Sequence, residues 1–207
     1  MTRPVQGRRA TNKADKLRRI TQAADALFKY KGYDRTTMRD ISATAGVGFG
    51  TLFDYSSSKR DLLFLIFNPL LIETLDTSHC AAVKLQGYGN QVMRLFEGFY
   101  TLYEKEPQLS RFLLRELNFY SEGLEAEKFL AQRADFLHCL EHLTSDAQAV
   151  GEIKAELPTD AIAKILRSVY AWEVRRWIAT DPLDLNIGVR ELRRLVDIQI
   201  QGFKFSG

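Results

Sequence analysis

Residues 27–63 read LFKYKGYDRTTMRDISATAGVGFGTLFDYSSSKRDLL, and this stretch decides the fold. Thr37 is followed three residues later by Asp40, a pair whose side chains can satisfy the unpaired amides of a helix start. The helix that begins there is short, because Gly46 lets the chain turn with a left-handed backbone. A second, equally short helix is expected over about residues 49–55.

Two further helices flank this pair. The serines at 56–58 end the second short helix, and Ser58 with Asp61 forms another capping pair that starts a helix at Lys59. The preceding helix is expected from residue 12 or 13 to Gly32, because apolar residues repeat along it at intervals of three and four. They are Leu17, Ile20, Ala24, Leu27 and Phe28.

Two short capped helices braced by a longer one are the build of a helix-turn-helix unit. The side chains expected to converge between the helices are Ile41, Ala45, Val47 and Leu52. Those left facing outward are Phe49, Gly50, Thr51 and Phe53. A DNA major groove offers thymine methyls and base edges to such a surface. Packing in the protein's own core is the alternative for the two phenylalanines.

The same stretch resembles the headpiece of the tetracycline-repressor (TetR) family, whose pattern runs from F-x-x-x-G-[YF]-x-x-T-[ST] through A-G-V to G-T-L-Y and S-K. The matching residues are Phe28, Gly32, Tyr33, Thr36, Thr37, Ile41, Ala45, Gly46, Val47, Gly50, Thr51, Leu52, Tyr55, Ser58 and Lys59. The resemblance implies an all-α protein: a three-helix helix-turn-helix domain followed by a larger helical domain that binds an effector and dimerises.

By position, the resemblance also implies where DNA is bound. Thr37, Tyr55 and Lys59 would hold backbone phosphates, and Gly50, Thr51 and Phe53 would approach bases. The complete set of expected DNA-binding residues is Thr36, Thr37, Phe49, Gly50, Thr51, Phe53, Tyr55 and Lys59. Lys59 in the first turn of a helix suits a phosphate contact, and Gly50 lacks a side chain that would hold the helix away from the groove.

Four positions depart from what the family usually carries. Gly48 stands where a serine often caps the recognition helix, Phe53 lacks the hydroxyl of the usual tyrosine, and Ser56 replaces a phenylalanine. Asp54 is unusual on a helix that faces phosphates. It can accept a hydrogen bond from a cytosine amine or point at Arg60, and we favour the second interpretation.

Charge and helical pattern divide the chain. Residues 1–60 hold 13 Lys/Arg and 5 Asp/Glu, a net charge of +8, whereas the remaining residues hold 16 and 21, a net charge of −5. A basic head can neutralise phosphates while an acidic body stays off the polyanion. We expect a flexible basic arm (1–12), the DNA-binding domain (13–60) and the effector-binding and dimerisation domain (61–207). Beyond residue 60, helices are expected over about 60–80, 90–105, 107–121, 124–149, 159–179 and 188–205.

Composition points to a cytoplasmic protein with no membrane partner. The longest apolar run, residues 62–72, is well short of the roughly 20 residues that a spanning helix needs. The basic N-terminus is not followed by the apolar stretch of a secretory signal. Cys80 and Cys139 lie far apart in the sequence, so we interpret both as buried small side chains rather than a disulfide or a metal site.

Nothing indicates an enzyme or a cofactor. The chain has no G-x-S-x-G motif, phosphate-binding loop or dinucleotide fingerprint. His138, Glu141 and His142 do spell H-x-x-E-H, the order of one zinc-protease signature. Because the two histidines face away from the helix's apolar stripe and no third ligand is evident, we expect a solvated face and no metal, with an adventitious or regulatory metal as the alternative.

Aromatic residues crowd the middle of the chain. Core packing is their ordinary role, but the family resemblance implies an effector pocket in this region, and an aromatic lining suits a hydrophobic or aromatic effector. The expected lining residues are Phe67, Leu71, Phe96, Phe99, Tyr100, Tyr103, Leu113, Leu117, Tyr120, Phe136 and Tyr170.

The last two helices carry strong apolar stripes. The resemblance implies that two copies of this helix pair form a four-helix dimer interface. The expected interface residues are Ile165, Val169, Trp172, Leu192, Leu195, Val196 and Phe203. A two-fold dimer places its recognition helices about one DNA turn or a multiple apart, so the operator should be a near-palindrome.

The leading hypothesis is therefore a ligand-responsive homodimeric repressor whose partners are operator DNA, a small-molecule effector and a second copy of itself. A regulator without an effector is the nearest alternative, and a helical homodimeric adaptor that has lost DNA affinity is the alternative from another class. Pro69 should kink the helix that begins at Lys59 and separate a part that moves with the headpiece from a part that packs on the body. A static irregularity in a core helix is the competing interpretation of Pro69.

Overall fold

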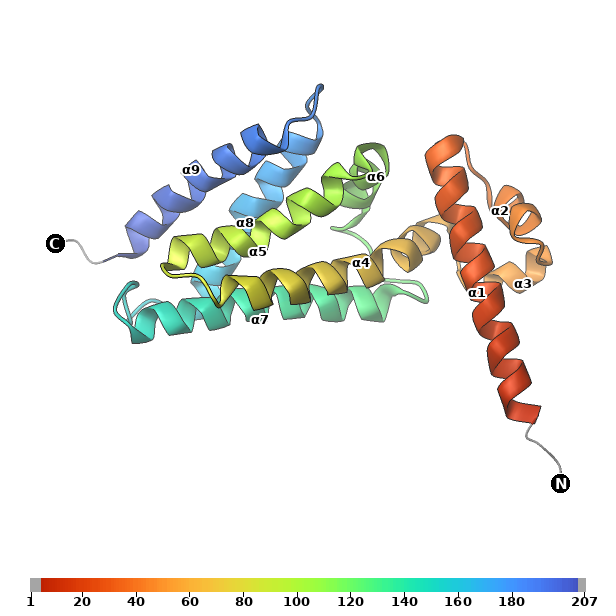
Figure 1. Cartoon of the computed structure of the whole chain (residues 1–207), viewed down its shortest axis with the longest axis horizontal. Helices are drawn as coiled ribbons and strands as arrows, with labels where there is room; N and C mark the ends of the chain where they lie inside the picture. The colour runs from red at the N-terminus through yellow and green to blue at the C-terminus, as the bar shows by residue number, and fades with distance from the viewer. Residues whose placement is uncertain (1–4, 205–207) are drawn as a thin grey trace. The chain divides into compact units, whose positions relative to one another are not determined.

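The computed structural model describes residues 5–204, with side chains described from residue 10 onward, and the regular structure of these residues is helical with no strand (Figure 1). The helices are α1 (Val5–Tyr30), α2 (Met38–Ala45), α3 (Phe49–Phe53), α4 (Lys59–Ala82), α5 (Tyr88–Glu104), α6 (Pro107–Glu116), α7 (Ala126–Ala149), α8 (Thr159–Ile178) and α9 (Leu185–Phe203). The predicted all-α class is confirmed. Within the described part of the chain, no helix is long and apolar enough to cross a bilayer.

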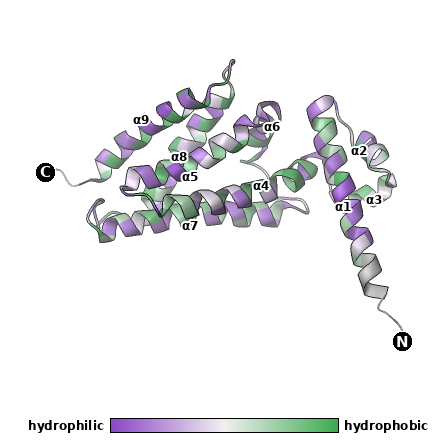
Figure 2. Ribbon diagram, viewed as in Figure 1, coloured by the Kyte–Doolittle hydropathy of each residue, from purple (hydrophilic) through white to green (hydrophobic). Residues whose placement is uncertain are grey.

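The chain divides into two compact units, and the division differs from the expected one. The N-terminal unit comprises residues 1–69 and 112–129, and the C-terminal unit comprises residues 70–111 and 130–207. The boundary expected after residue 60 instead falls at Pro69, inside α4. The first part of α4, a run of hydrophobic residues in Figure 2, completes the core of the N-terminal unit: Leu62, Leu63 and Phe64 are fully buried.

Helix α1 also differs from expectation, because it begins at Val5 rather than at residue 12 or 13. The expected flexible arm is therefore helical from residue 5 onward, and residues 1–4 lie outside the described part of the chain. Once buried residues such as Ile20 and Ala24 hold the later turns, each further residue adds one backbone hydrogen bond without a new nucleation step.

The core of the N-terminal unit contains a buried carboxylate. Asp61 accepts hydrogen bonds from the Tyr120 hydroxyl and from the backbone amides of Ser57 (2.8 Å), Leu124 (3.2 Å) and Glu125 (3.0 Å). Burial raises the pKa of Asp61, but these donors outweigh it and hold the pKa below its usual value. Asp61 thus joins the start of α4 to the segment that precedes α7.

Close helix approaches shape the C-terminal unit. At Gly98 on α5, a Cβ atom would lie 1.8 Å from the Ser78 hydroxyl oxygen on α4, so only glycine allows this crossing. At Gly188 on α9, a Cβ atom would lie 2.3 Å from Trp177 of α8, whose indole N–H donates to the Asp184 carbonyl (2.8 Å). These contacts fix α5 against α4 and α8 against α9.

Candidate functional site

The start of α2 is built as the sequence predicts. Thr37 is the N-cap, its hydroxyl accepts from the Asp40 amide (3.1 Å), and the Asp40 carboxylate accepts from the Thr37 amide (2.9 Å). Lys31 at the end of α1 donates to the same carboxylate (2.6 Å). The Lys31 hydrogen bond, followed by those from Thr37, lowers the pKa of Asp40 to about 2. A charged, capped helix start therefore holds α2 against α1.

The turn between α2 and α3 is confirmed. Gly46 adopts the left-handed conformation (φ 62°), and its amide together with that of Val47 binds the last carbonyls of α2. Gly48 is the N-cap of α3 and has no side chain to cap it. A Cβ atom there would meet only the Thr51 hydroxyl at 3.5 Å, so a serine fits this position without strain.

Helix α3 presents an aromatic face outward. Phe49 and Phe53 are 43% and 44% exposed, and their rings meet edge to face at 5.2 Å. Leu52, on the opposite face, is fully buried. A Cβ atom at Gly50 would meet nothing within 4 Å, so the packing of the chain does not explain a glycine there. The outward orientation of both phenylalanines is confirmed, and the alternative that they pack in the core is wrong.

Sequence analysis missed Arg39. Its guanidinium lies 5.6 Å from the centroid of the Phe49 ring, so a basic residue of α2 joins the exposed face of α3. Arginine is the residue that most often contacts guanine edges and phosphates. The sequence alone could not reveal this neighbour, because the two residues are ten positions apart and meet only through the angle at which α2 and α3 cross.

One predicted DNA contact, Thr36, is buried inside the protein. Thr36 is 1% exposed, and its hydroxyl donates to carbonyl oxygens of Leu27 (3.2 Å) and Gly32 (2.8 Å). The prediction that Thr36 binds DNA is therefore wrong, because its side chain ties off the end of α1.

Lys59 forms hydrogen bonds within the chain. Its ammonium donates to the carbonyl oxygens of Tyr33 (2.8 Å) and Asp34 (3.1 Å) and lies 4.5 Å from the Tyr33 ring centroid. Two of its three donors are thus used within the chain, and Lys59 holds the loop that leads to α2. The DNA roles of Thr51, Tyr55 and Lys59, which are partly exposed, and of Thr37, which is exposed, stay predictions.

The structure bears on two of the departures from the family pattern and explains one of them, Ser56. Ser56 is fully buried and its hydroxyl donates to the Ser58 carbonyl (2.9 Å), so it shapes the turn into α4. The interpretation that Asp54 points at Arg60 is wrong. Arg60 pairs with Glu116 (3.5 Å) and donates to the Phe119 carbonyl (3.0 Å), because the start of α4 packs beside the segment after α6.

The predicted effector-pocket residues divide between the two units. Those in the N-terminal unit are Phe67, Leu113, Leu117 and Tyr120, and those in the C-terminal unit are Leu71, Phe96, Phe99, Tyr100, Tyr103, Phe136 and Tyr170. Tyr120 stacks on Phe64 at 3.6 Å and binds Asp61, so it is a core residue of its own unit. The assembly of one pocket from the whole set stays a prediction.

In the C-terminal unit the aromatic residues form one cluster. The Phe96 ring lies 4.7 Å from Tyr170 and 6.0 Å from Phe136, and Phe99 lies 5.2 Å from Phe136. The Tyr100 hydroxyl is buried beside this cluster and has no hydrogen-bond partner among the described residues. An unpaired buried hydroxyl is costly, so this oxygen is a position where a polar group of a ligand or a water would be stabilised.

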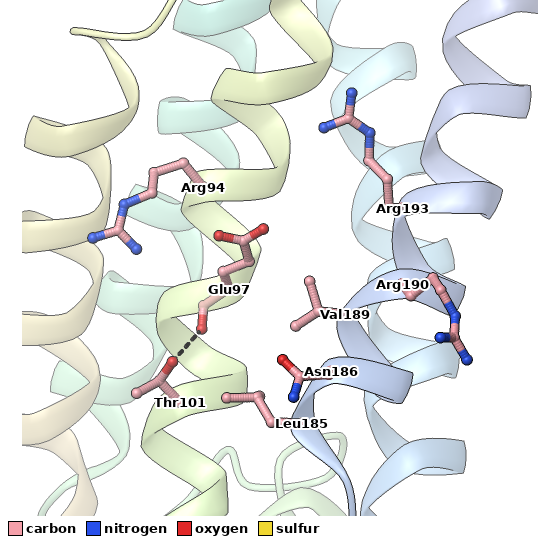
Figure 3. Close-up of a pocket in the computed structure, with 8 residues that line it drawn as sticks. All are labelled: Arg94, Glu97, Thr101, Leu185, Asn186, Val189, Arg190 and Arg193. Carbon is pink, nitrogen blue, oxygen red and sulfur yellow. Dashed lines mark hydrogen bonds between the residues drawn. The ribbon is translucent and has the colours of Figure 1, made fainter.

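A surface cavity of about 450 Å³ also lies in the C-terminal unit, between α5 and α9 (Figure 3). Its lining residues are Arg94, Glu97, Thr101, Leu185, Asn186, Val189, Arg190 and Arg193. None of the predicted effector-pocket residues lines it. Burial raises the pKa of Glu97, and Arg94 and Arg193 oppose this rise. Figure 3 shows the side chains of Arg94 and Arg190 pointing away from one another, so the arginines do not converge on one point.

The predicted dimer face is only partly available. Leu192 and Val196 are fully buried inside the chain, so their assignment to a dimer interface is wrong. They lie on the side of α9 that packs against α5 and α8, where the core of the unit has already used them. Trp172 (71%) and Ile165 (41%) of α8 remain exposed, and Val169, Leu195 and Phe203 are partly exposed.

Sequence analysis missed two exposed apolar residues of α9, Ile187 and Ile198. At about 100° per residue these two lie on the side of α9 opposite the buried Val196, outside the apolar stripe on which the prediction is based.

His138 and His142 are exposed, as a solvated face requires. His142 lies 3.2 Å from Asp146, and its ring meets that of His79 edge to face at 6.2 Å. Among the residues that the structure describes, no group of three or more His, Cys, Asp or Glu side chains could hold a metal ion. The predicted burial of the cysteines is wrong for Cys80, which is exposed, and Cys139 is half-buried.

Comparisons with known proteins bear on both units. Residues 20–66 match the model of the family described as bacterial regulatory proteins, tetR family. An uncharacterized HTH-type transcriptional regulator of Bacillus subtilis (strain 168), YvdT, is 41% identical over 61 residues, which are 30% of this chain and only 31% of that protein.

Solved structures extend the likeness to most of the chain. The FadR repressor of Thermus thermophilus, a TetR-family protein solved with lauroyl-CoA, has a TM-score of 0.71 at 20% identity and covers 92% of this chain and 96% of its own. FadR of Bacillus subtilis, solved with stearoyl-CoA, has a TM-score of 0.69 at 20% identity and covers 86% and 96%. At such identities the likeness shows the fold.

Fold and site together define an all-helical transcriptional regulator with an N-terminal helix-turn-helix. The match to the tetR family of bacterial regulatory proteins covers residues 20–66, which include the helix-turn-helix. The resemblance inferred from the sequence is confirmed.

Proposed function

We propose that this chain is a homodimeric repressor that acts in the cytoplasm, binds a palindromic operator and leaves it when a small hydrophobic molecule binds. The exposed face of α3 carries the DNA-binding part of the proposal. Two half-exposed phenylalanine rings, the open position at Gly50 and the Arg39 guanidinium lie together on one surface. A short helix gains nothing from exposing two aromatic rings to water, whereas a major groove offers them thymine methyls.

The surface of α8 and α9 supports the dimer. Trp172 and Ile165 on α8 and Ile187 and Ile198 on α9 leave large apolar side chains in water. Burying such a surface against its own copy removes it from water at roughly 25 cal/mol per Å². A two-fold axis through this surface relates two recognition helices, so the operator consists of two inverted half-sites.

The aromatic cluster supports the effector. Its rings would suit a hydrophobic ligand, and the unpaired Tyr100 hydroxyl would suit one polar group on it. Because the similar FadR structures hold lauroyl-CoA and stearoyl-CoA, fatty acyl-CoA thioesters are the first effectors to test on this chain.

Selection of duplexes from a random pool by the purified protein tests the DNA-binding part. We expect an inverted repeat, and affinity that falls steeply as salt rises because bound phosphates release counterions. Absence of any preferred sequence would favour the homodimeric adaptor. Lauroyl-CoA should then weaken binding to the selected duplex, and an unchanged affinity with a panel of acyl-CoA chain lengths would leave a regulator with another effector or none.

Trp172→Glu tests the dimer, because a charge buried in an apolar interface costs several kcal/mol. We expect a monomer by sedimentation, with half-site affinity only. Val150→Glu is the matched control, since Val150 is 73% exposed in the turn after α7 and should leave the dimer intact. A Trp172→Glu protein that remains dimeric would move the interface to another surface.

A further inference from the structure

Helix α1 continues well beyond the body of the N-terminal unit. Its first fully buried residue is Ile20, and residues 10–15 are all exposed. At 1.5 Å per residue, the helix from residue 10 to Ile20 projects by about 15 Å. Figure 1 shows this half of α1 extending past α2 and α3, and Figure 2 shows it as largely hydrophilic.

The side of this projection that continues the buried stripe is basic. At about 100° per residue, Lys13 and Lys16 lie within about 40° of Ile20 around the helix axis. The stripe that packs on the headpiece at Ile20, Ala24 and Phe28 therefore carries two lysines where the headpiece ends. From Ile20 onward this side of α1 packs on the protein's own helices, and before Ile20 it carries positive charge.

The nearest acid does not neutralise these lysines. Asp15 pairs with Arg18 (2.7 Å) and Arg19 (3.3 Å), and Asp15 and Arg18 lie on the opposite side of the helix. Lys13 and Lys16 form no ion pair with the side chains described in residues 10–204. Arg19 of α1 reaches the turn that leads to α3. Its guanidinium lies 3.5 Å from the position that a Cβ atom would take at Gly46.

A short, highly charged helix without a packed side is marginal in water. This basic side belongs to the same unit as the recognition helix, and Arg19, one turn further along α1, lies beside the α2–α3 turn. Duplex DNA held by α3 presents phosphates beyond the bases that it reads, and lysine is well suited to bind them without sequence preference. We propose that Lys13 and Lys16 are a second DNA contact, which holds backbone phosphates that flank the half-site. This inference rests on the proposed function and extends its footprint.

The test compares two duplexes: the selected inverted repeat alone, and the same repeat with ten added base pairs on each side. The variant is Lys13→Gln with Lys16→Gln, which keeps helix propensity and leaves a side chain of similar length at each position. We expect wild type to prefer the longer duplex and the double variant to bind that duplex at least about tenfold more weakly. The salt slope should fall by about two units per protomer, with the preferred sequence unchanged.

Arg18→Gln is the control, because it removes one positive charge from the opposite side of the same helix. It should retain the wild-type preference for the longer duplex. Equal affinity and equal salt slope of wild type and double variant on both duplexes would overturn the α1 contact and leave the α3 site standing. Failure of wild type to bind any duplex would instead overturn the proposed function, and the α1 contact with it.

Discussion

Phenylalanines occupy opposite environments in the two units. Phe49 and Phe53 stand half-exposed on a helix of five residues, whereas Phe96 and Phe99 are buried among other rings on a helix of 17. The same side chain therefore contributes to stability in one unit and is available to a partner in the other. Substitutions of the buried rings should change the stability of the protein, whereas substitutions of the exposed rings should change its affinity for a partner.

The largest effect is expected at Phe96. Truncation to alanine leaves a cavity among Tyr170, Phe136 and their neighbours, and should lower the free energy of unfolding by about 3–5 kcal/mol. Phe49→Ala should lower it by less than about 1 kcal/mol and act instead on DNA affinity. Urea unfolding of both variants measures the difference. Equal losses of stability in the two variants would break the comparison.

Asp61→Asn should give the next largest loss, about 3 kcal/mol at neutral pH, because an amide cannot accept all the hydrogen bonds that the carboxylate receives. The pKa of Asp61 is lowered in the folded protein. Its contribution is therefore complete above the unfolded-state pKa of about 3.9 and is lost as pH falls through the lower folded value. Unfolding measured from pH 7 to pH 2.5 should show this loss in wild type and not in the variant. Parallel pH profiles would exclude the role.

Thr51→Ala should leave folding intact and weaken binding to the preferred operator by about 1–3 kcal/mol at one or two base pairs. The measurement is affinity for single-base variants of the selected duplex. Gly48→Ala, which alters the exposed start of the same helix without touching Thr51, is the control for a general effect on that helix. A uniform loss across all sequences would assign Thr51 to the phosphates instead.

The smallest effect is a gain. Gly48→Ser supplies a hydroxyl at the N-cap of α3, where the backbone is already extended (φ −61°, ψ 143°) and the added Cβ has room. Stability should rise by a few tenths of a kcal/mol. Thermal unfolding beside Gly48→Ala separates the cap from the loss of glycine flexibility. A melting temperature no higher than that of the alanine variant would show that α3 does not need the cap.

The sequence by itself determined the features that depend on neighbours within about four residues. The capping pair of Thr37 and Asp40, the left-handed turn at Gly46 and the second cap at Ser58 are all present, because each rests on hydrogen bonds or backbone angles within one turn of helix. From these local signals followed the headpiece, the outward face of α3 and the family.

The tertiary structure decided how each side chain is used. Thr36 and Lys59 match the family pattern, yet the first is buried against α1 and the second holds a loop 25 residues away. Leu192 and Val196 share the stripe of α9 with exposed residues, but they pack in the core. Arg39 reaches Phe49 only because α2 and α3 cross. Periodicity states that a residue lies on an apolar or polar side, whereas only the packing of distant segments decides which partner covers it.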